Sequence, residues 1–234
     1  MGVSNGDRGA ELSASVYSRA WERMTEVLLT ERDAGAILDA LARITGETLG
    51  VDRSLIFQVK LGDQLAVGLC EWLNPAVEVT PTKATYPLAT FAGGDAFCRR
   101  ERRWLESHAA SPSSAFESDG SAAILHGPAM KIQSLLWYPF DFNDDGYYAL
   151  IFNQVTHERP WRPEELDFLR VVTRQVHLAL MQIAWHAERA QAERVMLEAQ
   201  KAESIRLLAG GVAHDFNTLL GVVLSSIARA KLAV

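Results

Sequence analysis

The sequence predicts an α+β fold, in which an antiparallel sheet with flanking helices is followed by a long C-terminal helix that forms a parallel coiled-coil dimer. Three observations lead to this prediction. Two apolar stripes with helical spacing occur near the start, two pairs of strand-like segments are each joined by a turn, and residues 164–209 contain neither Gly nor Pro. The 234 residues, 48% of them hydrophobic, suffice for one domain with its own core plus an extended element.

The first helix is expected to begin at Ser15, because residues 1–14 are mostly small and polar and are predicted to be disordered. A second helix is expected to stop at Gly50, since Gly commonly ends helices in a left-handed conformation. Both segments carry large apolar side chains every three or four residues, as a helix with one buried face requires. These side chains are Tyr17, Trp21, Met24 and Leu28, followed by Ile37, Leu38, Leu41, Ile44 and Leu49.

Two antiparallel hairpins are expected to form the sheet. Residues 54–59 and 64–72 have strand character and are separated by a turn at 61–63. Residues 134–140 and 147–154 form the second pair, with Asn, Asp and Gly at the turn between them. The segment between the hairpins, about residues 74–129, is irregular, with a helix expected at 97–109 and a partly extended alternative for 99–106.

The composition excludes several classes of function. A net charge of −6 and an isoelectric point near 5.5 provide no basic surface for nucleic acid. Cys70 and Cys98 are widely separated and the start of the chain has no apolar leader, so reduced thiols in the cytoplasm are expected. No apolar run reaches the roughly twenty residues of a membrane span, because Gln182 and His186 interrupt the best candidate.

The order of these elements, and the residues that close the domain, resemble a GAF domain over about residues 15–181. The resemblance is strongest in the strand that ends at Pro139-Phe140, the strand with Ala149-Leu150-Ile151-Phe152, and the run Arg159-Pro160-Trp161-Arg162-Pro163-Glu164-Glu165 that leads into the last helix. PAS domains of similar size usually lack such a run. The resemblance implies a pocket between the sheet and the irregular segment that covers it.

An unidentified small-molecule signal is expected to bind in this pocket. Six aromatic residues are candidates for its lining: Trp72, Tyr86, Phe91, Phe97, Trp104 and Trp137. Core packing is the alternative for each of them. Cys98 would be the attachment point of a bilin, although Arg99 follows it where bilin-binding relatives often have His. His108, His126 or His157 would be the candidates for ligating haem iron, and no Cys/His cluster predicts a metal site.

The long helix is predicted to contain a signalling linker over residues 182–204 and to dimerise through one apolar seam. The seam weakens where Ala and Arg occupy it, and its phase shifts between Leu197 and Ile205. Its residues are Leu166, Leu169, Val176, Leu180, Ile183, Ala187, Ala190, Arg194, Leu197, Ile205, Leu208 and Val212. The alternative is a helix that packs along its own domain.

The run from Leu208 to Leu220, LAGGVAHDFNTLL, carries residues for phosphoryl transfer. The imidazole of His214 is a nitrogen nucleophile near neutral pH, and the adjacent carboxylate of Asp215 can accept its proton. A helix places Thr218 one turn after His214, on the same face. As an alternative, His214 would be an ordinary residue of an amphipathic helix.

This run resembles the phosphoacceptor box of the dimerisation and phosphoacceptor domain of sensor histidine kinases, of which residues 205–234 would be the first helix. The resemblance implies that His214 attacks the γ-phosphate of ATP, that Asp215 acts as acid and base, and that Thr218 supports phosphatase chemistry. Thr218 replaces an Asn found in many relatives. Only twenty residues follow His214, so the ATP-binding domain with its ATP and Mg²⁺ is expected to lie outside this chain, which would have no cofactor of its own.

The sequence therefore predicts the sensory and phosphoacceptor part of a cytoplasmic protein-histidine kinase. Its expected partners are a second copy of itself, the ATP-binding domain of the parent protein and the receiver domain of a response regulator. Two other functions stay open: a non-catalytic module that binds a small molecule and dimerises, and a GAF receptor that carries a chromophore or haem.

Overall fold

The computed structural model of this protein describes the backbone of residues 5–232, and the side chains of residues 15–186, 188–206 and 216–221. The chain divides into two units, Met1–Ile183 and Ala184–Val234, which are described separately. Among the described residues, none of the helices combines the length and apolar character needed to cross a bilayer.

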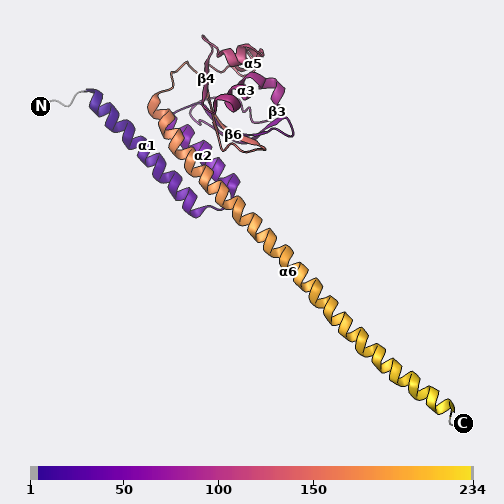
Figure 1. The fold of residues 1–234 in the computed structure, drawn as a ribbon. Helices are drawn as coiled ribbons and strands as arrows, with labels where there is room; N and C mark the ends of the chain where they lie inside the picture. The colour runs from indigo at the N-terminus through magenta and orange to yellow at the C-terminus, as the bar shows by residue number, and fades with distance from the viewer. Residues whose placement is uncertain (1–4, 233–234) are drawn as a thin grey trace. The chain divides into compact units, whose positions relative to one another are not determined.

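The first unit is built on a six-stranded antiparallel sheet with the order β3-β2-β1-β6-β5-β4 (Figure 1). The two hairpins predicted from the sequence form its centre, because the first strand of the first hairpin pairs with the second strand of the second. The strands are β1 Arg53–Lys60, β2 Leu65–Leu73, β3 Thr85–Pro87, β4 Leu105–His108, β5 Ser134–Phe140 and β6 Gly146–Gln154.

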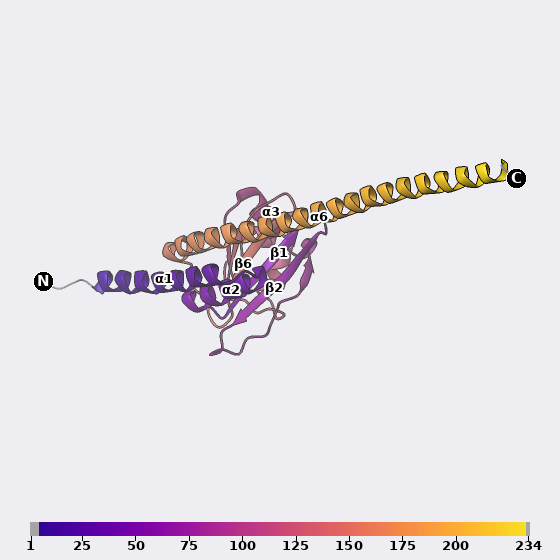
Figure 2. The ribbon, with the colours of Figure 1, turned by 90° about the horizontal axis from the view of Figure 1, so that it is seen from below.

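Helices cover one face of this sheet (Figures 1 and 2). They are α1 Asn5–Thr30, α2 Ala34–Leu49 and the first part of α6 Pro163–Leu232. Their apolar faces and alternate residues of the central strands form a helix-side core that includes Met24, Leu41, Ile56, Phe152 and Val176. The two expected apolar stripes of α1 and α2 are thus confirmed as core-facing.

The opposite face of the sheet is covered by shorter elements. These are the 3-10 helix η1 Leu88–Phe91, which follows the edge strand β3, and the helices α3 Ala92–Glu101, α4 Ser114–Glu117 and α5 Ser121–Leu125. Because strand side chains alternate between faces, the strands supply a second, separate core here, with Leu55 and Phe57 from β1 and Trp137 from β5. The sheet therefore has two independent apolar faces.

Two glycines have the backbone conformations that their positions require. Gly50 ends α2 at φ +63°, and its N–H reaches back to the last helical carbonyls, as the sequence predicts. Gly146 begins β6 at φ +155°, where a Cβ would collide with the carbonyl of Val59 on the neighbouring strand. At the start of α2, Asp33 caps the helix by accepting a hydrogen bond from Ala36 N at 2.8 Å.

The N-terminal helix is longer than the sequence analysis expected. It begins at Asn5 instead of Ser15, so residues 5–14 are helical where disorder was predicted. Ala10, Glu11 and Leu12 are good helix formers that the polar composition of this stretch concealed. Residues 1–4 of the predicted disordered segment lie outside the described residues.

The helix expected at 97–109 is wrong in its second half. α3 stops at Glu101 because Arg102 adopts a left-handed conformation, with its N–H bonded to Cys98 O at 2.9 Å. The chain then forms β4, which pairs with β5 and buries Leu105 and Ser107. The partly extended alternative comes closer, because pairing with a neighbouring strand outweighs the helix propensity of this charged segment. The short strand β3 was also missed.

The seam predicted for a dimer is wrong over residues 163–183. Leu169, Val176 and Leu180 are buried in the helix-side core, and Leu166 and Ile183 pack against it. In this part α6 packs along its own domain, which was the alternative. The reason is that an apolar stripe of this spacing fits a sheet as well as a second helix.

A different apolar stripe of α6 is exposed on the first unit. It consists of Val171, Leu178 and Met181, of which Val171 is 46% and Leu178 57% exposed. Residues 171 and 178 are separated by seven positions, and 181 by three more, which is the a and d spacing of a coiled coil.

The second unit consists of the continuation of α6 to Leu232. Eight large apolar side chains of its described part are exposed: Trp185, Val195, Met196, Leu197, Ile205, Phe216, Leu219 and Leu220. The side chains at 187, 208 and 212 of the predicted seam lie outside the described residues. A single helix cannot bury these apolar groups against itself.

Candidate functional site

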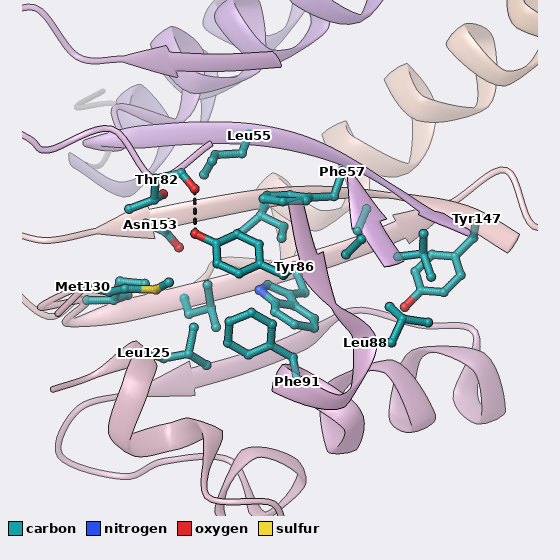
Figure 3. A pocket seen from close by; sticks show the side chains of 17 residues that line it. Leu55, Phe57, Thr82, Tyr86, Leu88, Phe91, Leu125, Met130, Tyr147 and Asn153 are labelled. Carbon is teal, nitrogen blue, oxygen red and sulfur yellow. Dashed lines mark hydrogen bonds between the residues drawn. The ribbon is translucent and has the colours of Figure 1, made fainter. Parts of the chain in front are cut away.

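A cavity lies between the sheet and the elements that cover its second face (Figure 3). It has a volume of about 60 Å³ and is lined by 17 side chains, most of them apolar. They come from every strand except β4, from the segment before β3, and from η1, α5 and the loop after α5. The lining residues are Leu55, Phe57, Val59, Ala66, Thr82, Tyr86, Leu88, Phe91, Leu125, Met130, Ile132, Leu135, Trp137, Tyr147, Ala149, Ile151 and Asn153.

Aromatic rings form one wall of the cavity. The rings of Phe57 and Tyr86 have centroids 5.9 Å apart, Tyr86 and Phe91 meet edge to face at 5.6 Å, and Phe91 meets Trp137 in the same way at 5.8 Å. Behind them, Phe116 packs against Trp137 at 4.9 Å. Edge-to-face contacts of this kind fix ring orientation, so this wall is rigid and presents a defined shape.

The polar groups at one end of the cavity are already engaged with the protein. The hydroxyl of Tyr86 donates to Thr82 O at 2.8 Å (Figure 3). The amide oxygen of Asn153, oriented toward the guanidinium, accepts from Nε and Nη2 of Arg53 at 3.0 Å each. Arg53 Nη1 donates to Thr80 O at 2.7 Å. Burial raises the pKa of the Tyr86 hydroxyl. Burial also lowers the pKa of the Arg53 guanidinium, and the nearby carboxylate of Glu71 partly offsets this lowering.

At the other end, Tyr147 donates its hydroxyl hydrogen to Asp95 Oδ1 at 3.1 Å. Asp95 is also paired with Arg99 at 2.9 Å, so its charge is compensated. Burial is the main reason that the pKa of Tyr147 is raised, and the phenol is neutral at physiological pH.

Three of the six aromatic residues predicted to line the pocket do line it: Tyr86, Phe91 and Trp137. The other three lie elsewhere. Trp72 and Trp104 pack against the helix-side core, and Phe97 packs beneath the second face, where Arg103 covers its ring at 4.9 Å. The sequence analysis missed the other fourteen lining residues. Many of them belong to β1, β5 and β6, where side-chain alternation separates the two faces but does not distinguish lining from filling. The rest belong to β2, η1, α5 and the adjoining loops.

Neither cysteine of the described chain lines the cavity. Cys98 belongs to the second-face core, whereas Cys70 belongs to the helix-side core, and both are buried as free thiols. Burial raises the pKa of each thiol to about 12, so the nucleophilic thiolate is scarce at neutral pH.

The histidines considered for haem also lie away from the cavity lining. His108 Nδ1 pairs with Ser134 Oγ at 2.9 Å, and His157 Nδ1 with Thr156 Oγ1 at 3.0 Å. His126 uses both ring nitrogens, toward Ile132 O at 2.7 Å and Ser107 Oγ at 2.8 Å. Among the described residues there is no cluster of three or more potential metal ligands.

The Ser107–His126 pair has the residue types of a nucleophile and its base, but its surroundings do not suit catalysis. Ser107 is buried in β4, and its hydroxyl also accepts from Ser113 N at 3.0 Å. With Nδ1 of His126 facing a backbone carbonyl, the pair connects β4, α5 and the segment before α4. It is a structural hydrogen-bond network.

The predicted phosphoacceptor residues lie on the second unit, within α6. The backbone is helical at His214, Asp215 and Thr218, as the sequence predicts, so positions 214 and 218 are one turn apart. The side chains of His214 and Asp215 lie outside the described residues. The neighbouring Phe216 is exposed.

The sequence model of the GAF domain matches residues 33–180. The chain belongs to the GAF domain family. The match includes all six strands of the sheet and ends within α6, and the antiparallel sheet with flanking helices predicted from the sequence is confirmed. Among curated proteins, none matches this chain.

Solved structures with the same fold include GAF domains that bind bilins. The phycoerythrobilin-bound GAF domain of a cyanobacterial phytochrome is 15% identical, with a TM-score of 0.60 over 76% of this chain and 99% of that one. The phycocyanobilin-bound GAF domain of a cyanobacterial phytochrome is 17% identical, with a TM-score of 0.58 over 74% and 96%. The GAF domain of an Acinetobacter phosphoenolpyruvate-protein phosphotransferase is 13% identical, with a TM-score of 0.52 over 81% and 99%.

The residues of this GAF domain do not fit a covalently attached bilin. A thioether needs a reactive cysteine facing the chromophore, and the described cavity lining contains neither Cys70 nor Cys98. The cavity volume of about 60 Å³ is also below the 300 Å³ or so that a drug-sized ligand occupies.

Proposed function

We propose that this chain is the sensory and phosphoacceptor part of a two-component sensor histidine kinase. In this proposal a small molecule binds in the cavity of the GAF domain, and its binding alters the reactivity of His214 through α6. The observation that carries the proposal is that one helix, α6, packs on the sheet whose other face lines the cavity and continues to the HDFN run at residues 214–217.

Strands β5 and β6 connect the cavity with α6 by alternation of their side chains. Trp137 and Ile151 line the cavity, whereas their neighbours Tyr138 and Phe152 belong to the helix-side core together with α6. A ligand that displaces either strand would therefore also displace the side chains that pack against α6.

A polar contact strengthens the same connection. Just beyond β5, Asp141 adopts a left-handed conformation at φ +54°, and its Oδ1 lies 2.6 Å from Nδ1 of His177 on α6. The chain just after β5 is thus tied to the helix that leads to His214.

In the proposed reaction, a ring nitrogen of His214 attacks the γ-phosphorus of ATP. The N–P bond forms as the bond to the β,γ-bridging oxygen breaks, ADP leaves, and the proton of the imidazole passes to Asp215. The phosphoryl group is then transferred to an aspartate of a response-regulator receiver domain. ATP and Mg²⁺ would be bound by a separate ATP-binding domain.

The proposal includes a parallel homodimer through α6. Because the predicted seam is buried over residues 163–183, the dimer contact on the first unit would involve Val171, Leu178 and Met181 instead. On the second unit, Trp185 and Val195 continue the same seven-residue register in the sequence and are exposed.

Replacing His214 tests the phosphoacceptor role. With a histidine-kinase ATP-binding domain and labelled ATP supplied in trans, the wild-type chain is expected to acquire acid-labile label and His214→Gln to acquire none. The donor must label a complete acceptor domain in the same assay. An unlabelled wild-type chain that is folded and dimeric would contradict the proposal and favour a binding and dimerisation module without phosphotransfer.

A further inference from the structure

Trp137 carries an unsatisfied polar atom at the cavity. It is 8% exposed, it lines the cavity, and its indole Nε1 has no hydrogen-bond partner. Among the described residues that line the cavity, no other buried side-chain nitrogen or oxygen lacks a hydrogen-bond partner. A buried N–H without an acceptor is unfavourable, because it has lost its hydrogen bond to water and gained nothing in return.

Comparison with Trp161 shows why the position of Trp137 matters. Nε1 of Trp161 is also buried without a partner, but this ring packs in the helix-side core against Phe152, with the guanidinium of Arg159 over it at 4.6 Å. None of the described pockets is lined by Trp161. Trp137 borders a space that a molecule with a hydrogen-bond acceptor can occupy.

The cavity favours an uncharged ligand. None of its 17 described lining side chains is ionised at neutral pH. Arg53, the cation next to Asn153, already directs Nη1 to Thr80 and Nε and Nη2 to Asn153. An anionic or cationic ligand would therefore be desolvated without a free counter-charge, which is strongly unfavourable.

The size of the cavity limits the ligand to a small molecule. A dry apolar cavity of about 150 Å³ holds benzene, whereas the volume here is about 60 Å³. Met130 is a flexible side chain of the lining, and its displacement would have to enlarge the cavity before a single ring fits. The aromatic wall of Phe57, Tyr86 and Phe91, with one tilted and one edge-to-face contact, offers ring edges and faces to such a molecule.

We propose that the cavity binds a small, uncharged, largely apolar molecule with a single ring and one hydrogen-bond acceptor, such as a carbonyl oxygen, which accepts from Nε1 of Trp137. This inference rests on the proposed function, in which the cavity is the sensory site. It assigns to Trp137 the role of selecting the ligand by its acceptor.

Three probes of similar shape test this ligand class on the full chain: acetophenone, ethylbenzene and benzoate. Acetophenone has the carbonyl, ethylbenzene lacks it, and benzoate adds a negative charge. We expect acetophenone to bind about tenfold more tightly than ethylbenzene, since one donor is satisfied only by the first. Benzoate is expected to bind at least tenfold more weakly than acetophenone. In ¹⁵N-resolved spectra, only acetophenone should shift the indole N–H signal of Trp137 downfield.

Matched tryptophan variants assign the effect to one indole. In Trp137→Phe the preference for acetophenone over ethylbenzene should fall below about twofold, whereas in Trp161→Phe it should stay near tenfold. Both variants lose a buried, unpartnered N–H, and only one of these borders the cavity. If Trp137→Phe does not fold, the indole shift in the wild-type chain decides the question.

Equal binding of acetophenone and ethylbenzene would overturn the inference, as would tighter binding of benzoate or the failure of all three to bind a folded chain. Each of these outcomes leaves the phosphoacceptor role of His214 standing. If acetophenone binds as expected but His214 accepts no phosphoryl group, the proposed function fails and the ligand class stands.

Discussion

Replacing Val176 with Asp is expected to reduce the free energy of unfolding of the first unit by at least about 4 kcal/mol. Val176 is 0% exposed and lies in the helix-side core with Leu169, Val172 and Phe152. The substitution removes apolar burial and places a carboxylate among the uncharged side chains of the described helix-side core. Chemical denaturation followed by far-UV circular dichroism measures the loss.

The same substitution at Val171 provides a matched control. Val171 lies on the same helix but is 46% exposed. At about 100° per residue, positions 171 and 178 of the exposed stripe lie about 140° and about 160° around the helix axis from position 176. Val171→Asp should change the free energy of unfolding of the isolated domain by less than about 1 kcal/mol. It should weaken self-association at least tenfold in sedimentation experiments. If Val176→Asp folded normally but dissociated the dimer, the originally predicted seam would be correct.

Replacing Glu165 with Gln is expected to destabilise the first unit by about 3 kcal/mol, because it leaves a largely buried guanidinium without its counter-charge. Glu165 is 1% exposed in the first turn of α6, is paired with Arg159, and accepts from Arg162 N at 2.8 Å. Arg159 also donates to Leu49 O at 2.7 Å, so this pair ties the start of α6 to the end of α2. Thermal and denaturant unfolding measure the effect.

Glu164→Gln is the control for Glu165→Gln, because Glu164 is the adjacent glutamate in the same first turn of α6 but is exposed. Both variants lose one negative charge near the positive end of the helix dipole, and that shared effect is worth less than about 1 kcal/mol. Glu164→Gln should therefore cost no more than that. Equal destabilisation by the two variants would mean that the buried ion pair contributes nothing beyond the dipole.

The centre of the fold follows from local sequence patterns. Alternation and turn residues located β1, β2, β5 and β6 within one or two residues, and the Gly at position 50 ended α2 as expected. These features depend on short-range chemistry, namely side-chain alternation and positive φ angles, which a single sequence carries.

The parts that were missed depend on long-range contacts. β4 is a strand because β5 lies beside it, and residues 102–109 alone favoured a helix. The stripe at Leu169, Val176 and Leu180 indicated a buried face, but the sequence does not state whether a sheet or a second helix buries it. Only three of the six aromatic residues proposed for the pocket, Tyr86, Phe91 and Trp137, line it. The prediction failed for the other three because aromatic character alone does not separate the two faces of the sheet.

The most direct test of the link between the cavity and His214 is the rate of His214 labelling in Ala149→Leu. Ala149 is buried on β6 and lines the cavity, so a leucine there occupies the space that a ligand would take. With donor domain and labelled ATP in excess, we expect the labelling rate to differ at least threefold from that of the wild-type chain. Acetophenone should change the rate in the wild-type chain and leave it unchanged in the variant. A folded Ala149→Leu chain that is labelled at the wild-type rate would contradict the proposed coupling.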